Sequence, residues 1–202
     1  GRLTADEANA NRARLQAVRL ATHAAVELAA RVDETIGVAV WGTHGPTVLH
    51  WEPSSRPVSM SLRAGAVLPL LRSATGRVFA AWLPDEVLAP FVAAEAAASV
   101  DGGETGEPGT RRLTAEVRRV RESVRRDGIA VLDQVASFLD RSAVAVAAAS
   151  VPVFDSDGRI LLALTALGES GHIDVSAGAP VPRALAACAK ELARTLGGSA
   201  AA

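Results

Sequence analysis

The sequence predicts an α+β fold in which an antiparallel sheet is flanked by helices. Two observations support this class. Segments with a strand pattern come in groups, at 35–62 and 129–167, and do not alternate regularly with helical segments. Grouped strands favour antiparallel pairing over a doubly wound parallel sheet. The chain also opens with a long helical pattern, so we expect a long N-terminal helix beside the sheet.

Residues 4–32 form that helical pattern. Thr4 and Glu7 have the spacing of a capping box. Apolar or small residues then recur at three- and four-residue steps, at Leu15, Val18, Thr22, Ala25, Ala29 and Val32. This narrow seam fits packing on the chain's own sheet and packing on the same helix of a second subunit equally well.

The first strand group follows this helix. Residues 35–42 are apolar and β-branched, His44-Gly45-Pro46 has turn chemistry, and residues 47–51 and 57–62 alternate in the manner of strands. Gly65 then breaks the strand pattern.

The stretch 73–83 predicts a short apolar helix that Ser73 or Thr75 can cap. Amides in the first turn of a helix carry partial positive charge, so this helix start could seat a carboxylate. A capped helix without a ligand is the alternative interpretation. A second helix is expected to start at 83–86, with Pro84 at an early position.

Residues 99–112 are rich in Gly and predict a surface loop. A helix is expected over 113–126, with an apolar stripe of Leu113, Val117, Val120 and Val124. Its arginines lie mostly off that stripe. Because the net charge of the chain is −1, a solvated face is favoured over a patch that binds anions or nucleic acid.

The second strand group begins after Gly128. Strands are expected at 129–135, 143–154 and 159–167, the last two joined by a type I′ turn at Asp157-Gly158. A final helix is expected over 182–196.

Composition and motifs exclude several classes of function. Of the 202 residues, 49% are hydrophobic and only 3% aromatic, so we expect a folded chain without stacking platforms for bases. The single cysteine fits a reducing, cytoplasmic location, and no signal peptide or membrane span is recognisable. We therefore expect a cytoplasmic protein.

We expect no metal, cofactor or enzymatic activity. The four histidines lack metal-site spacing, and no hydrolase, Walker or dinucleotide motif occurs. Cys188 lies among small residues of the last helix and is expected to be buried and inert. A hydrolase that uses Cys188 is the weaker alternative, and rapid alkylation of this thiol by iodoacetamide would support it.

Two stretches of the chain resemble the IclR family of bacterial transcription regulators. The first is 73–83 with Arg63-Ala64-Gly65 and Pro69-Leu70 ahead of it. The second is Val151-Pro152-Val153-Phe154-Asp155, then Gly158-Arg159-Ile160 and 163–168. Arg126-Asp127-Gly128-Ile129-Ala130 between them fits the family's Arg-x-x-Gly before a strand. Order and spacing agree, apart from extra residues between Val135 and Ala143.

The resemblance implies a GAF-like effector-binding domain over 15–197, with 1–14 as the remnant of a linker and the start of the N-terminal helix. We expect residues 198–202 to form a disordered tail. Such regulators carry an N-terminal winged helix-turn-helix, which is absent from this chain. The implied function is a sensor that controls DNA binding through that missing domain, as a homodimer or homotetramer. A stand-alone GAF-like sensor or scaffold is the alternative.

The resemblance also implies a ligand site. A small organic effector would sit against the amides of Ala74 and Thr75, where Gly76 allows close approach. The remaining site residues would be Asp133, Thr165 and Leu167, with Met60, Leu68 and Val146 as apolar walls. Leu167 and Gln134 stand where the family often has polar groups. We therefore expect a larger, moderately apolar or aromatic effector, with or without a carboxylate, over a small hydrophilic acid.

Overall fold

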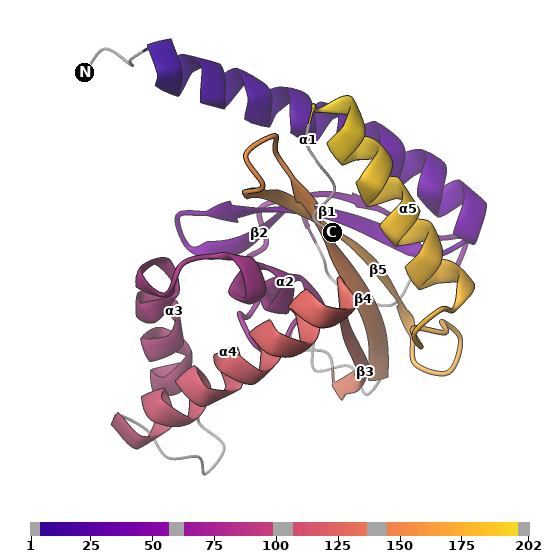
Figure 1. Ribbon diagram of the computed structural model, residues 1–202. Helices are drawn as coiled ribbons and strands as arrows, with labels where there is room; N and C mark the ends of the chain where they lie inside the picture. The colour runs from indigo at the N-terminus through magenta and orange to yellow at the C-terminus, as the bar shows by residue number, and fades with distance from the viewer. Residues whose placement is uncertain (1–4, 57–62, 99–106, 137–144, 198–202) are drawn as a thin grey trace.

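The computed structural model describes residues 5–56, 63–98, 107–136 and 145–197, and confirms the predicted α+β class. Its described strands form one antiparallel sheet in the order β2-β1-β5-β4-β3, with helices on both faces (Figure 1). The strands are β1 Thr35–Gly42, β2 Gly45–Glu52, β3 Ala130–Ala136, β4 Ala145–Phe154 and β5 Ile160–Glu169. The helices are α1 Ala5–Val32, α2 Ala74–Trp82, α3 Asp85–Ala98, α4 Glu107–Asp127 and α5 Pro180–Thr195.

Helices α1 and α5 cover one face of the sheet (Figure 1). The buried residues of α1 are Ala17, Ala21, Ala25, Leu28 and Ala29. Leu15, at the start of the predicted seam, is 68% exposed and takes no part in packing on the chain's own sheet. Because alanines let helices approach closely, the contact face is centred on them. Packing of α1 against β1, β5 and α5 confirms the intramolecular alternative for this part of the helix.

Helices α2, α3 and α4 lie on the opposite face (Figure 1). Helix α2 lies next to the sheet, and α4 packs mainly against α2. Phe79 of α2 is fully buried there, with its ring centroid 5.7 Å from that of Trp41. The predicted apolar stripe of α4 is confirmed: Leu113, Val117, Val120 and Val124 are all buried. Two arginines off that stripe, Arg121 and Arg125, bond carbonyl oxygens at the end of α2.

Helix α4 begins earlier than expected. The predicted loop is wrong from Glu107 onward, because the helix starts there and not at Leu113. Pro108 falls in the first turn, where its missing N–H costs no intrahelical bond. Buried Gly109 is small enough to pack at the same turn. The loop's other residues, 99–106, lie outside the described residues, as do Thr4 and the strand expected at 57–62.

The β4–β5 hairpin is confirmed, but its turn differs from the expected type I′. That turn needs positive φ at both central residues. Gly158 has a φ of 73°, whereas Asp33 is the only described non-glycine residue with positive φ. The Asp155 carboxylate accepts from the N–H groups of Asp157 and Arg159, at 2.9 and 2.8 Å, which favours a longer turn.

The sheet face below α2 is set by strand alternation. Ala163, Thr165 and Leu167 of β5 lie on this face, and Thr165 pairs with Ser150 of β4 and Gly37 of β1. None of the helices in the described segments is long and apolar enough to cross a membrane.

Candidate functional site

The start of α2 is organised by Ser73. Its side-chain Oγ accepts from the Gly76 N–H at 2.9 Å and donates to the Pro69 carbonyl at 2.6 Å. Ser73, and not Thr75, is therefore the cap of the predicted helix. A hydroxyl that accepts from the first turn leaves the two intervening amides, those of Ala74 and Thr75, to find other acceptors.

Those two amides have no acceptor among the described residues. Ala74 is 2% exposed and Thr75 is 3% exposed, so neither residue is open to bulk water. Buried backbone N–H groups in native proteins are almost always paired. Two neighbouring donors at the positive end of a helix are therefore suited to an anionic or strongly polar oxygen.

A chain of three buried hydroxyls runs from α2 into the sheet. Thr75 Oγ1 lies 2.8 Å from Thr165 Oγ1, which donates to Ser150 Oγ at 2.8 Å, and Ser150 Oγ donates to the Leu164 carbonyl at 3.2 Å. Each hydroxyl has one proton, so Thr75 must donate to Thr165. The lone pairs of Thr75 Oγ1, the first of the three hydroxyls, then remain available as acceptors.

This hydroxyl chain predicts non-additive effects of substitution. Replacing Thr165 with Val removes the acceptor of the buried Thr75 hydroxyl, so we expect the free energy of unfolding to fall by about 2 kcal/mol. Thr75→Val should cost about 1 kcal/mol, and the double variant should cost less than the sum, by about 0.5 kcal/mol or more. Urea unfolding measures all three, with exposed Thr114→Val as the control. Strict additivity would show that the hydroxyls are not coupled.

The segment ahead of α2 is held on both sides. The Glu95 carboxylate on α3 accepts from the N–H groups of Leu70 and Leu71, at 2.8 and 3.3 Å. Arg77 Nε donates to the Leu71 carbonyl at 2.8 Å. Burial raises the pKa of Glu95, and the two backbone hydrogen bonds oppose that rise. The backbone segment that leads into the α2 amides is therefore hydrogen-bonded both to α3 and to α2 itself.

Gly76 completes this arrangement. A Cβ at this position would lie closer than 3.0 Å to the carbonyl oxygens of Pro69 and Leu70. The absent side chain therefore lets the preceding segment fold directly against the helix start.

Six of the predicted site residues lie on the α2 side of the sheet. Thr165 contacts Thr75 directly, and buried Leu167 lies two residues further along the same strand face. Val146 and Leu167 belong to the apolar cluster that packs around α2. The structure thus places Ala74, Thr75, Gly76, Thr165, Leu167 and Val146 within one layer.

Asp133 is not brought to this layer. It lies where the register of β3 shifts, between Leu132 and Val135, and it lines a hollow with Ile173 and Val175 of the cluster on the α1–α5 side. Its carboxylate accepts from Ser170 Oγ at 3.1 Å, and it lines a surface hollow with His172 and Asp174.

Leu68 and Met60 are the two remaining residues that were predicted as apolar walls of the ligand site. Leu68 is buried, but its backbone N–H donates to the Pro46 carbonyl of β2, so it lies at the β2 edge of the sheet. Met60 lies outside the described residues.

Sequence reasoning missed three residues of this region. Ser150 is the only hydroxyl in an apolar strand, and Glu95 is the only carboxylate in α3 after its first turn. Both patterns signal a buried polar partner. The ring of Trp51 covers Gly37 on the same sheet face as Thr165, and leaves no room there for a Cβ. The absent side chain at Gly37 was the available signal.

Cys188 of α5 is a free thiol and is half-buried, not fully buried as expected. Burial raises the pKa of the Cys188 thiol, which disfavours its reactive thiolate form. Across the described segments, no three His, Cys, Asp or Glu side chains lie close enough together to hold a metal ion.

Comparison with known proteins supports the fold and the family. The chain matches the family described as bacterial transcriptional regulator IclR, C-terminal, over residues 10–194. No curated protein sequence matches it significantly. The crystal structure of Pseudomonas aeruginosa HmgR is similar at 28% identity and a TM-score of 0.76, over 98% of this chain and 75% of that one.

Two separately solved domains have the same fold. The C-terminal domain of Escherichia coli KdgR shares 18% identity at a TM-score of 0.67, over 90% of this chain and 98% of that one. The inducer-binding domain of Acinetobacter PobR was solved as a double mutant with 3-hydroxybenzoic acid. It shares 18% identity at a TM-score of 0.65, over 86% of this chain and 95% of that one.

Proposed function

The chain belongs to the IclR family of bacterial transcriptional regulators through its C-terminal domain, and we propose that its effector site is the start of α2. The observation that carries this proposal is the pair of buried amides of Ala74 and Thr75, which have no acceptor among the described residues. A bound effector would supply the acceptor that these donors lack. The domain then acts as the sensor of a transcriptional regulator.

The groups around these amides define the effector's chemistry. The two amides donate, so they favour a carboxylate oxygen, whereas Thr75 Oγ1 has lone pairs that favour a donor such as a hydroxyl. Leu167 and Val146, together with the ring of Trp51, are apolar neighbours in the same layer. An aromatic or moderately apolar carboxylic acid, with or without a hydroxyl, fits these groups better than a small keto acid. The PobR inducer-binding domain was crystallised with such a compound.

The effector would act by shifting a population of states. It changes DNA binding only if it binds one arrangement of the regulator better than the other. In this proposal the DNA contact is made by a winged helix-turn-helix and not by this sensor domain. The regulator works in the cytoplasm as a homodimer or homotetramer, because paired DNA half-sites require paired subunits.

Calorimetry with 3-hydroxybenzoate and pyruvate tests the proposed site. We expect 3-hydroxybenzoate to bind more tightly, because it offers a carboxylate, a hydroxyl and an apolar ring. Thr75→Val should weaken its binding by about fivefold, the loss of one hydrogen bond, while Thr114→Val should not change it. Tighter binding of pyruvate would contradict the proposed effector class. Equal affinity of the Thr75→Val and Thr114→Val proteins would contradict the site.

A further inference from the structure

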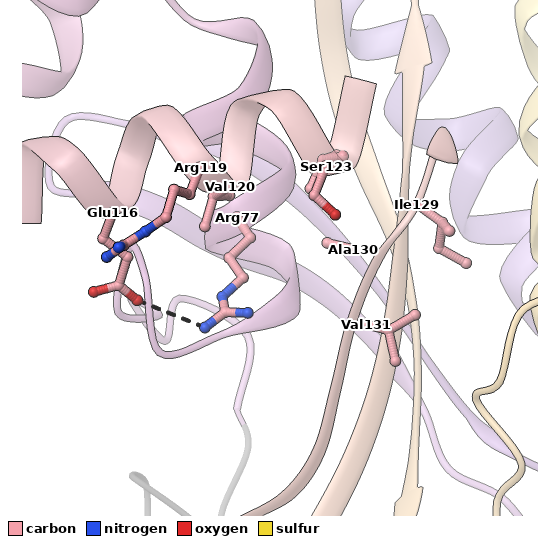
Figure 2. Close-up of a pocket in the computed structure, with 9 residues that line it drawn as sticks. Arg77, Glu116, Arg119, Val120, Ser123, Ile129, Ala130 and Val131 are labelled. Atoms are coloured by element: carbon pink, nitrogen blue, oxygen red, sulfur yellow. Dashed lines mark ion pairs between the residues drawn. The ribbon is translucent and has the colours of Figure 1, made fainter. Parts of the chain in front are cut away.

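A second hollow lies between α4, α2 and the edge strand β3, and Figure 2 shows the side chains that line it. Its volume is about 470 Å³, within the range of small-molecule sites. The charged lining groups are Arg77, Arg119 and Glu116, so their net charge is +1. Ser123 stands at the rim, where its hydroxyl already donates to Asp127.

Arg77 is incompletely paired at this hollow. Its side chain is only 27% exposed, and its Nε is committed to the Leu71 carbonyl. Nη2 lies 3.8 Å from Glu116 Oε1, which is an ion pair but too long for a hydrogen bond. Burial lowers the pKa of Arg77, and Glu116 only partly opposes that effect. Within the described residues the two Nη groups accordingly have no hydrogen-bond acceptor.

The rest of the lining is apolar. Val120, Val124 and Ala130 are buried, and Ile129 is half-buried beside them. In Figure 2, Arg77 and Glu116 lie at one end of the hollow. Ala130, the first residue of β3, and Ile129 just before it lie at the other end. An anionic head with a compact apolar body matches this division.

We propose that this hollow is a second ligand site, specific for a monocarboxylate with a compact apolar body. The carboxylate pairs with the Nη groups of Arg77, a planar match that guanidinium groups favour, and Arg119 adds charge from α4. The body contacts Val120 and Ala130. A dianion such as phosphate fits less well, because Glu116 would repel its second charge.

This site is separate from the α2 amides but shares a segment with them. Thr75 and Arg77 are two residues apart, about 200° around a helix, so their side chains leave α2 on different sides. Thr75 contacts the sheet, and Arg77 reaches α4. Arg77 also holds the Leu71 carbonyl of the segment that precedes the amides. A ligand on Arg77 would thus stabilise the same segment that positions the effector site.

Amide NMR on the ¹⁵N-labelled protein tests the proposal, with benzoate as the probe and benzamide as its neutral isostere. We expect benzoate, and not benzamide, to shift the amide signals of residues 119–131 and 77. Arg77→Gln should weaken this binding about tenfold or more, as expected for loss of a half-buried charged partner. Arg119→Gln should weaken it two- to threefold, since that side chain is exposed. Arg159→Gln, on the distant β4–β5 hairpin, should leave it unchanged.

Three results would overturn the second site: no shifts over 119–131, equal shifts with benzamide, or unchanged affinity in both Arg77→Gln and Arg119→Gln proteins. Thr75→Val separates the two sites. If benzoate shifts only residues 73–76 and Thr75→Val weakens the binding that causes those shifts, the effector site stands and the second site fails. If the shifts at 119–131 persist in Thr75→Val, the second site stands on its own. Because Arg119 is exposed on α4, its variant keeps the test valid even if Arg77→Gln is unstable.

Discussion

Gly76→Ala is expected to destabilise the domain by about 3 kcal/mol, at the upper end of overpacking effects. The added Cβ would meet the backbone oxygens of Pro69 and Leu70, and backbone atoms cannot swing aside as a flexible side chain can. Either the segment ahead of α2 or the first turn of the helix must move. The same displacement would disturb the Ala74 and Thr75 amides, so effector binding should weaken as well.

Urea unfolding measures the loss of stability, and Gly65→Ala is the matched control. Gly65 has a φ of 89° but nothing within 4 Å of its would-be Cβ, so that substitution should cost only about 1 kcal/mol of conformational strain. If Gly76→Ala costs no more than Gly65→Ala, the close contact with residues 69 and 70 does not exist in solution.

Phe79→Ala is expected to cost about 4 kcal/mol, as is typical for removing a fully buried aromatic ring. Phe79 lies in α2 between the sheet and α4, in an apolar cluster that extends from Ala39 of β1 to Val124 of α4. Its removal would leave a cavity that these rigid neighbours cannot fill. The midpoint of thermal unfolding should fall by roughly 8–16 °C.

Phe91→Ala provides the comparison for Phe79→Ala. Its ring also contacts Trp41, at 4.8 Å between centroids, but the residue is only partly buried. We expect a loss of about 1–2 kcal/mol, because part of the ring is already in water. Equal losses in the two variants would contradict the assignment of Phe79 to the centre of the core.

Local signals in the sequence were sufficient for most elements and for the capped start of α2. The hydroxyl of Ser73 before an apolar run predicted the capped start of α2, and Gly158 predicted a hairpin. The family resemblance assigned Thr75 and Thr165 to one ligand site. Their hydroxyls are in contact although the residues are 90 positions apart, which local patterns could not predict.

The failures have physical causes in tertiary packing. Gly109 resembles a loop residue, but α4 begins before it because the turn is packed and buried. Leu15 is more hydrophobic than Ala17, yet the close approach of α1 and α5 buries the smaller residue. Asp133 was expected beside the α2 amides from a family position, but it lies at the register shift of β3, beside Ile173 and Val175 on the other side of the sheet.

The central position of β5 has a consequence for the chain as it leaves the ribosome. Until β5 is made, β1–β2 and β3–β4 are two hairpin-like pairs with no strand to join them, because β5 bonds to both β1 and β4. Val38 of β1 pairs with Leu164 of β5, so the sheet can close only after β5 has been made. Truncation before Ile160 would leave unpaired strand edges in both halves, and such fragments should aggregate rather than fold.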